Sequence, residues 1–226
     1  LSGLRPHEAW CEARRLERDL SAELAFGFTE KWGHLTACAT NAGTGLRASI
    51  LVHLPGLVLT QEMERIARGI AEMGSTVRGF YGEGTEAAGN LFQVSNQVTL
   101  GRSEGEILEA LNRVNEQLIE CEGNAQDKLM REVRAQIEDK IWRAYGILNH
   151  ARLLTSQEFM NLSSAVRLGV GLGIIRDIGV RDINELMVRT RSSHVQCFTG
   201  RRLEPCERDR VRAEMVRRRM AEARGG

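Results

Sequence analysis

The sequence predicts an α+β fold, in which a largely antiparallel sheet flanked by helices precedes an all-helical C-terminal region. Short segments of alternating apolar residues occur only in the first 100 residues. Their connections are too short for parallel crossovers throughout, which favours antiparallel pairing. From residue 103 onward, helical spacing and capping signals replace the strand pattern. With 226 residues, 42% hydrophobic and 27% charged, the chain is long enough to bury a substantial core.

The first 100 residues mix two helices with four strands. Trp10, Leu16, Leu20 and Leu24 are spaced by about one or two helical turns, which predicts an amphipathic helix over 7–25. A second helix is expected to begin at Thr60, a capping residue, and to end at Gly74. The predicted strands cover residues 34–40, 46–54, 76–82 and 91–100.

Capping signals divide the helical part of the chain. Ser103 with Glu106 forms the signature of a capping box ahead of a long helix to about Arg152. The pairs Thr155 with Glu158 and Asp182 with Glu185 repeat that signature before two more helices, and Pro205 precedes a final charged helix. We expect two domains, residues 1–150 and residues 151–226.

Composition excludes several classes of protein. The net charge of +1 argues against a direct nucleic-acid binder. Five cysteines without a C-x-x-C pair argue against a disulfide framework and against a metal site, and they favour a reducing cytoplasm. Neither a membrane span of about 18 apolar residues nor a signal peptide is found in the sequence, so no membrane partner is expected.

The stretch "CATNAGTGLRASILVHLP", residues 38–55, combines a glycine turn with an arginine at the start of a strand. Gly43 and Gly45 permit the backbone angles of a tight turn. A guanidinium held at Arg47 by the sheet is a permanently charged fork that fits phosphate oxygens. The alternative is a solvent-facing arginine on a hairpin.

A second stretch, "VRGFYGEGTEAAGN", residues 77–90, places Arg78, Glu83 and Glu86 among three glycines. Such a loop can fold over a ligand and present both a cation and a carboxylate, although a surface loop has the same composition. If the strands that carry Arg47 and Arg78 are adjacent, both guanidiniums reach one site.

These stretches together resemble the catalytic domain of the phosphagen (guanidino) kinases. "LTACATNAGTGLRAS" followed by "VRGFYGEGTEA" is especially similar to the bacterial protein-arginine kinases, and "VHLPGLVLTQ" and "LFQVSNQVTLG" have close counterparts in them. The resemblance implies that Arg47 and Arg78 bind the phosphates of ATP, with Mg²⁺ carried by the nucleotide. It implies that Glu83 orients the acceptor guanidinium and that Cys38 is the active-site cysteine beside it. The implied lining of the nucleotide site consists of Arg47, Ala48, Ser49, Ile50, Leu51, Arg78, Gly79, Phe80, Tyr81, Gly82 and Glu83.

The sequence departs from the family pattern at several points. Ala39 stands where the family has proline, and Leu51 stands where small-molecule phosphagen kinases have an adenine-stacking histidine. The family's Asn-Glu-Glu-Asp-His block and its Ser-x-Arg loop are expected upstream of Leu1. The chain therefore resembles the C-terminal two-thirds of such an enzyme and is expected to be inactive alone.

The last candidate site is "RDRVRA", residues 208–213, which matches a phosphoarginine-docking motif of the protein-arginine kinases. Arg208 and Arg212 share a helix face, where they can clamp a phosphate, while Asp209 can accept from a guanidinium. Ala213 completes the motif. The alternative is a solvated arginine-rich helix.

The resemblance implies an enzyme that transfers the γ-phosphate of ATP to arginine side chains of proteins. It also implies a homodimer, a zinc-binding activator protein, and phosphoarginine proteins as partners. A free-arginine phosphagen kinase is one alternative, which the docking motif and the long helical extension disfavour. A phosphoarginine-binding adaptor or pseudokinase is another, because the upstream block is missing.

Overall fold

The structure is a computed structural model that describes residues 3–38, 41–79 and 88–225. The chain divides into two compact units: Leu1–Glu86 with Leu91–Asn124, and Ala87–Asn90 with Ala125–Gly226. This division lies earlier in the chain than the domain boundary predicted near residue 150, which itself stays a prediction. The first unit contains both sheets and the second contains only helices among its described residues, so the α+β fold class is confirmed.

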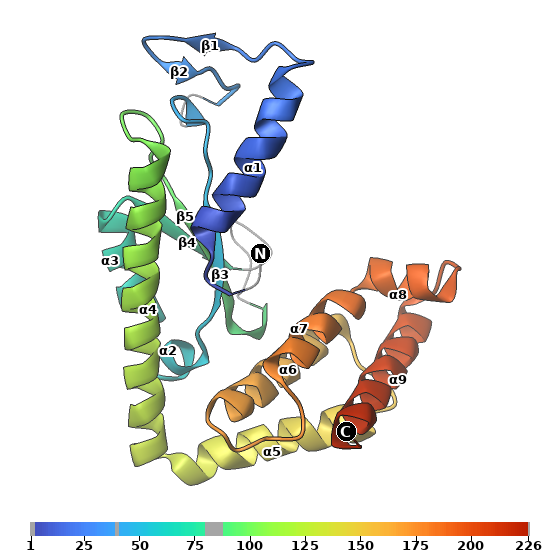
Figure 1. Cartoon of the computed structure of the whole chain (residues 1–226). Helices are drawn as coiled ribbons and strands as arrows, with labels where there is room; N and C mark the ends of the chain where they lie inside the picture. The colour runs from blue at the N-terminus through green and yellow to red at the C-terminus, as the bar shows by residue number, and fades with distance from the viewer. Residues whose placement is uncertain (1–2, 39–40, 80–87, 226) are drawn as a thin grey trace. The chain divides into compact units, whose positions relative to one another are not determined.

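Figure 1 labels the helices and strands of the chain. The sheet of the first unit has three antiparallel strands in the order β3-β5-β4. They are β3 (Ser49–His53), β4 (Ser75–Gly79) and β5 (Leu91–Asn96), and β5 pairs with both of the others. A separate hairpin is formed by β1 (Phe28–Thr29) and β2 (Gly33–His34). The antiparallel pairing agrees with the prediction, but β3 and β5 are shorter than the predicted strands over 46–54 and 91–100. Of the strand predicted over 34–40, residues 39–40 lie outside the described residues, and β2 includes only His34 of the remainder.

Four helices accompany these sheets: α1 (Pro6–Ser21), α2 (Pro55–Leu59), α3 (Met63–Glu72) and α4 (Glu104–Glu132), which belongs to the first unit up to Asn124. The prediction for Thr60 was wrong. Thr60 ends α2, where its hydroxyl donates to the carbonyl of Gly56 at 2.9 Å, and Glu62 is the N-cap of α3. The reason is Pro55, whose fixed φ starts a short extra helix before α3.

Two carboxylates cap helices in this unit. Glu106 accepts from the backbone N–H of Ser103 at 2.7 Å, and the Ser103 hydroxyl accepts from the N–H of Glu106, so the predicted capping box is confirmed. Glu122, which is buried in α4, accepts from the N–H groups of Gly56 at 2.7 Å and Leu57 at 3.0 Å. The Glu122 carboxylate therefore caps α2 from a position about 65 residues away in the sequence.

The second unit contains the short 3₁₀ helix η2 (Ala88–Asn90) and five α-helices beyond α4. These are α5 (Arg134–His150), α6 (Ser156–Gly171), α7 (Val180–Arg189), α8 (Ser192–Thr199) and α9 (Pro205–Arg224). The helix predicted from 103 to 152 is interrupted at Val133, whose φ of −138° is not helical. No helix within the described ranges is long and apolar enough to cross a membrane.

The remaining capping predictions had mixed outcomes. The hydroxyl of Thr155 accepts from the N–H of Glu158 at 3.1 Å, as predicted, and Pro205 is the first residue of α9. Asp182 does not begin its helix. The N-cap of α7 is Gly179, and Asp182 lies three residues later, where its carboxylate accepts from the Gly179 N–H at 2.9 Å. Gly179 and Asp182 have the three-residue spacing of a capping box, so the helix starts three residues earlier than the predicted pair of Asp182 with Glu185.

Candidate functional site

The glycine turn before β3 is packed tightly against neighbouring backbone. Gly43 has a φ of +104° and exchanges two backbone hydrogen bonds with His34, at 2.8 and 3.2 Å. A Cβ on Gly43 would lie 2.8 Å from the carbonyl oxygen of Thr99, so a side chain is excluded. The Thr99 hydroxyl donates to the carbonyl of Ala42 at 2.7 Å. The turn is therefore rigidly seated on the segment that follows β5.

Arg47 leaves this turn with an exposed side chain. Its guanidinium forms no hydrogen bond or ion pair with any residue in the described ranges. The next residues, Ala48 and Ile50, are half-buried, whereas Ser49 and Leu51 are exposed. Because this alternation is that of an extended strand, Arg47 shares the side of the sheet that carries Ser49 and Leu51.

Arg78 lies on the same face of the sheet as Leu51. Both residues pair with Gln93 of β5, and paired residues in an antiparallel sheet point to one side. The strands that carry Arg47 and Arg78 are not adjacent, because β5 lies between them. With strand spacings of about 4.8 Å and rises of about 3.3 Å per residue, the Cα atoms of Arg47 and Arg78 are roughly 16 Å apart. Two arginines so placed suit an extended anion with several charged groups better than a single phosphate.

The other residues predicted for this site are partly outside the described residues. Phe80, Tyr81, Gly82 and Glu83 lie in that uncertain part, whereas Gly79 ends β4 and is half-buried. Cys38 is exposed, and its carbonyl accepts from the Thr36 hydroxyl at 2.6 Å and from the Asn41 N–H at 2.9 Å. The roles predicted for these residues stay predictions.

The sequence analysis did not single out the residues that hold this turn in place. Thr99 seats Gly43, and the side chain of Asn96 bonds the backbone on both sides of Arg47. The available signal was modest: a polar residue ends the apolar alternation of "LFQVSN" and is followed by a second short apolar run.

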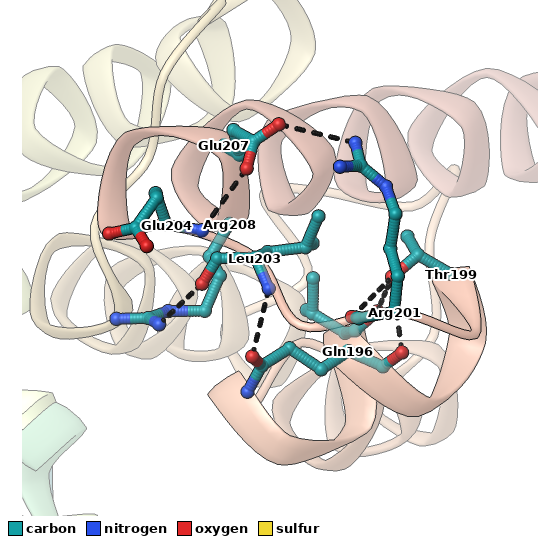
Figure 2. A network of polar contacts seen from close by, with 8 residues as sticks. Gln196, Thr199, Arg201, Leu203, Glu204, Glu207 and Arg208 are labelled. Carbon is teal, nitrogen blue, oxygen red and sulfur yellow. Dashed lines mark hydrogen bonds and ion pairs between the residues drawn. The ribbon is translucent and has the colours of Figure 1, made fainter.

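The second candidate site lies at the start of α9, where the linker from α8 is held by side chains on both sides (Figure 2). Arg208 donates to the carbonyl of Leu203 at 2.9 Å, and the Leu203 N–H donates to the Gln196 side chain at 3.0 Å. Glu207 accepts from the N–H of Glu204 and from the Arg201 guanidinium. These contacts, the Glu204 N–H first, hold the pKa of Glu207 below its usual value.

Arg212 is turned into the second unit rather than toward solvent, with 1% of its side chain exposed. It donates to the carbonyls of Thr190 at 2.8 Å and Leu154 at 2.6 Å, and it pairs with the Asp209 carboxylate at 2.5 Å. Asp209 itself is 26% exposed, and Ala213 is fully buried. The structure brings Asp209 and Arg212 together and directs Arg208 to a different partner. A phosphate reaches Arg212 only if these bonds give way.

Comparison with known proteins covers nearly the whole chain. Residues 1–125 match the ATP:guanido phosphotransferase C-terminal catalytic domain, and residues 134–225 match the protein-arginine kinase McsB C-terminal domain. A protein-arginine kinase of Symbiobacterium thermophilum is 49% identical over 97% of this chain and 62% of its own length. Similar proteins of the same name occur in Moorella thermoacetica, at 50% identity over 95% of this chain and 61% of that protein, and in Bacillus subtilis, at 45% over 94% and 59%.

Among solved structures, lombricine kinase is 32% identical over 48% of this chain and 31% of its own, with a TM-score of 0.42. The present chain spans about three-fifths of the length of the protein-arginine kinases it matches. The two matched domains meet close to the division between the two compact units, at Asn124. The chain belongs to the ATP:guanido phosphotransferase family, and its second unit matches the C-terminal domain of the protein-arginine kinases in that family.

Proposed function

We propose that this protein transfers the γ-phosphoryl group of ATP to arginine side chains of proteins. The observation that carries the proposal is the pairing of the two matched domains in one chain, a guanido phosphotransferase catalytic domain followed by a protein-arginine kinase C-terminal domain. Relatives named protein-arginine kinase match 94–97% of this chain at 45–50% identity.

Phosphoryl transfer from ATP to arginine requires groups that bind the phosphates and other groups that bind the acceptor guanidinium. The bond between the γ-phosphorus and the bridging oxygen of ATP breaks, a phosphorus–nitrogen bond to the acceptor guanidine forms, and ADP leaves. Arg47 and Arg78, fixed by the turn and by β4, stabilise the negative charge on the phosphates of the transition state. Because an arginine guanidinium is a poor nucleophile while protonated, a carboxylate has to hold it in line and accept its proton. Glu83 is the proposed carboxylate, with Cys38 beside the same guanidinium.

Activity of the full-length protein on a protein substrate tests this proposal. Arg47→Ala, Arg78→Ala and Glu83→Ala are each expected to lower turnover by about 10²-fold or more, the typical loss for one preorganised transition-state contact. Arg65→Ala is the matched control, because this exposed arginine of α3 pairs with Glu62, the N-cap of the same helix. Transfer to free arginine but not to proteins would favour a phosphagen kinase, and no transfer at all would favour an adaptor.

The match of the second unit to the McsB C-terminal domain supports a phosphoarginine dock at Arg208 and Asp209. Both side chains are half-buried at the start of α9, within reach of solvent, while Arg212 holds the Asp209 carboxylate. In this proposal Arg208 contacts the phosphate and Asp209 the guanidinium of the modified residue.

Calorimetric titration with matched peptides tests the dock. Phosphoserine peptides present only the phosphate, so they are expected to bind more weakly than phosphoarginine peptides. Asp209→Ala removes the group that distinguishes the two peptides, and Arg208→Ala weakens both by roughly 1.5–3 kcal/mol. The exposed Arg210 supplies the control Arg210→Ala. Equal affinity for both peptides, or no binding, would overturn the proposed dock.

The family resemblance supports the remaining parts of the proposal. Mg²⁺ enters with ATP, and the enzyme works in the cytoplasm as a homodimer on arginine-bearing proteins. A zinc-binding protein is its activator, and phosphoarginine proteins are its products and further partners.

A further inference from the structure

The side chain of Asn96 joins the end of β5 to the backbone that carries Arg47. Its Oδ1 accepts from the N–H of Ala48 at 2.8 Å, and its Nδ2 donates to the carbonyl of Leu46 at 3.0 Å. The two peptide groups that it binds lie on either side of Arg47. Nδ2 also approaches the carbonyl of Val98 at 3.3 Å, which ties the carboxamide to its own strand end.

The pairing of β3 with β5 explains why a side chain is needed there. Ser49 pairs with Ser95, so the next pair along the ladder is Ala48 with Asn96. In a regular antiparallel ladder a hydrogen-bonded pair exchanges two backbone bonds. Only one is backbone here, from the Asn96 N–H to the Ala48 carbonyl at 3.3 Å. The Asn96 carboxamide, which carries the same donor and acceptor as a peptide group, supplies the other.

Asn96 is the last residue of β5, and the residue after it forms its backbone hydrogen bond on the side of β5 that faces away from β3. The N–H of Gln97 donates to the carbonyl of Gly74, next to the start of β4. The backbone carbonyl of Asn96 is therefore replaced by the side-chain amide as the partner of Ala48. Asparagine is suited to this because its short side chain reaches backbone groups without leaving its own strand.

The result is a short segment anchored at both ends by residues 96–99. Thr99 binds Ala42 and leaves no space beside Gly43, and Asn96 binds Leu46 and Ala48. Between these anchors the side chain of Arg47 is exposed, whereas those of Thr44 and Leu46 are half-buried. This backbone is therefore ordered before any ligand binds, so that binding does not carry the entropic cost of ordering it. The direction of the Arg47 Cα–Cβ bond is fixed by the same contacts.

We propose that Asn96 is a positioning residue that holds the backbone on both sides of Arg47, so that the guanidinium meets the phosphates of ATP in a preset direction. The role of Arg47 in this statement rests on the proposed function. The clamp itself concerns only the backbone of residues 46–48.

The clamp is tested directly on the 226-residue chain by hydrogen exchange of assigned backbone amides. In Asn96→Ala, the Ala48 amide is expected to lose about tenfold in protection, equivalent to about 1.4 kcal/mol. Asn96→Leu, which is close to asparagine in shape but has neither the acceptor for Ala48 nor the donor to Leu46, is the second variant if the alanine variant unfolds, and the same loss of protection is expected in it. Gln97→Ala and Gln97→Leu are the controls, because the exposed side chain of Gln97 is one residue away. Unchanged exchange at Ala48 in both Asn96 variants overturns the clamp.

The link to Arg47 is tested by turnover in the full-length enzyme. A misplacement of about 1 Å can cost about 10²-fold, so Asn96→Ala is expected to lower kcat by roughly 10- to 100-fold. The same change in an Arg47→Ala background is expected to have little further effect, because no guanidinium is left to position. An equal loss in both backgrounds overturns the positioning role. If the wild-type enzyme transfers no phosphate to arginine, the proposed function fails, while exchange at Ala48 still decides the clamp.

Discussion

At the scale of single residues, the arginines of "RDRVRA" differ in what their guanidiniums contact. Arg210 is exposed, Arg208 is half-buried against the linker before α9, and Arg212 is almost fully buried. Arg212 contacts the ends of two other helices: the carbonyl of Leu154, just before α6, and the carbonyl of Thr190, which ends α7. One side chain thus holds three helices together.

This burial predicts different consequences for neighbouring substitutions. Arg212→Ala leaves two backbone carbonyls and the Asp209 carboxylate without their donor, so it is expected to destabilise the second unit by about 3–5 kcal/mol. Arg210→Ala, on an exposed position of the same helix, is expected to change stability by less than about 0.5 kcal/mol. Urea unfolding followed by circular dichroism measures both. Equal stability of the two variants would contradict the structural role of Arg212.

At the scale of elements, carboxylates located at helix starts join parts of the chain that are distant in sequence. Glu122 of α4 caps α2, and Asp182 of α7 binds the Gly179 N–H as well as Arg219 of α9. Each places a negative charge at the end of a helix where free N–H groups point outward. The two helix starts are stabilised by residues that also connect neighbouring helices.

Substitution of Glu122 tests the cap of α2. Glu122→Ala removes a charged acceptor from two buried N–H groups, so the free energy of unfolding is expected to fall by at least about 1.5–3 kcal/mol. Glu122→Gln keeps one acceptor oxygen and should lose less. Glu120→Ala, on an exposed position of the same helix, is the control. A loss in Glu122→Ala no greater than in the control would rule out the cap.

The cap at Asp182 predicts a pH dependence. The Gly179 N–H, followed by the Arg219 guanidinium, holds the pKa of Asp182 below its usual value. A lowered pKa in the folded state contributes stability that is fully present above the unfolded value of about 3.9 and is lost as the pH falls through the folded value. Asp182→Asn keeps an acceptor for the Gly179 N–H but cannot be protonated. Between about pH 6 and about pH 2, its free energy of unfolding is therefore expected to fall less than that of the wild type.

Unfolding of the second unit at a series of pH values measures this difference. Asp139→Asn is the matched control, because the Asp139 carboxylate pairs with Arg143 one turn away on the exposed face of α5. If Asp182→Asn and the wild type lose the same stability in acid, the Asp182 carboxylate is not responsible.

At the scale of the whole molecule, each compact unit has its own apolar core. Leu57, Val94 and Leu111 are almost fully buried in the first, and Ile141, Leu148 and Val166 in the second. Separate cores favour separate unfolding transitions, because a domain with its own core can unfold cooperatively by itself.

Matched core substitutions test this division. Leu111→Ala and Leu148→Ala each remove a leucine side chain that is at most 2% exposed, and each is expected to cost about 2–5 kcal/mol. Hydrogen exchange resolved by peptide is expected to show the loss in the first unit for Leu111→Ala and in the second for Leu148→Ala. A loss spread evenly over both units in either variant would show a single cooperative core.

Local signals predicted the elements well where the partners are close in sequence. The capping pairs Ser103 with Glu106 and Thr155 with Glu158 lie three residues apart, so one helical turn is enough to bring them together. Thr60 and Asp182 were assigned to the wrong positions. Several neighbouring residues are able to cap a helix, and the local sequence does not determine which of them becomes the N-cap. In α3 and α7 the N-caps are Glu62 and Gly179.

The sequence by itself determined the fold class, the antiparallel pairing, the family, and the glycine turn that presents Arg47, because alternation, capping intervals and motif order are local properties of the chain. Tertiary structure alone decided that β5 separates the strands of Arg47 and Arg78, that Asn96 reaches Ala48 across 48 residues, and that Arg212 faces inward. The same arginine can face solvent, a phosphate or a buried carbonyl, since its chemistry fits all three. Only the folded chain determines which acceptor lies within hydrogen-bonding distance.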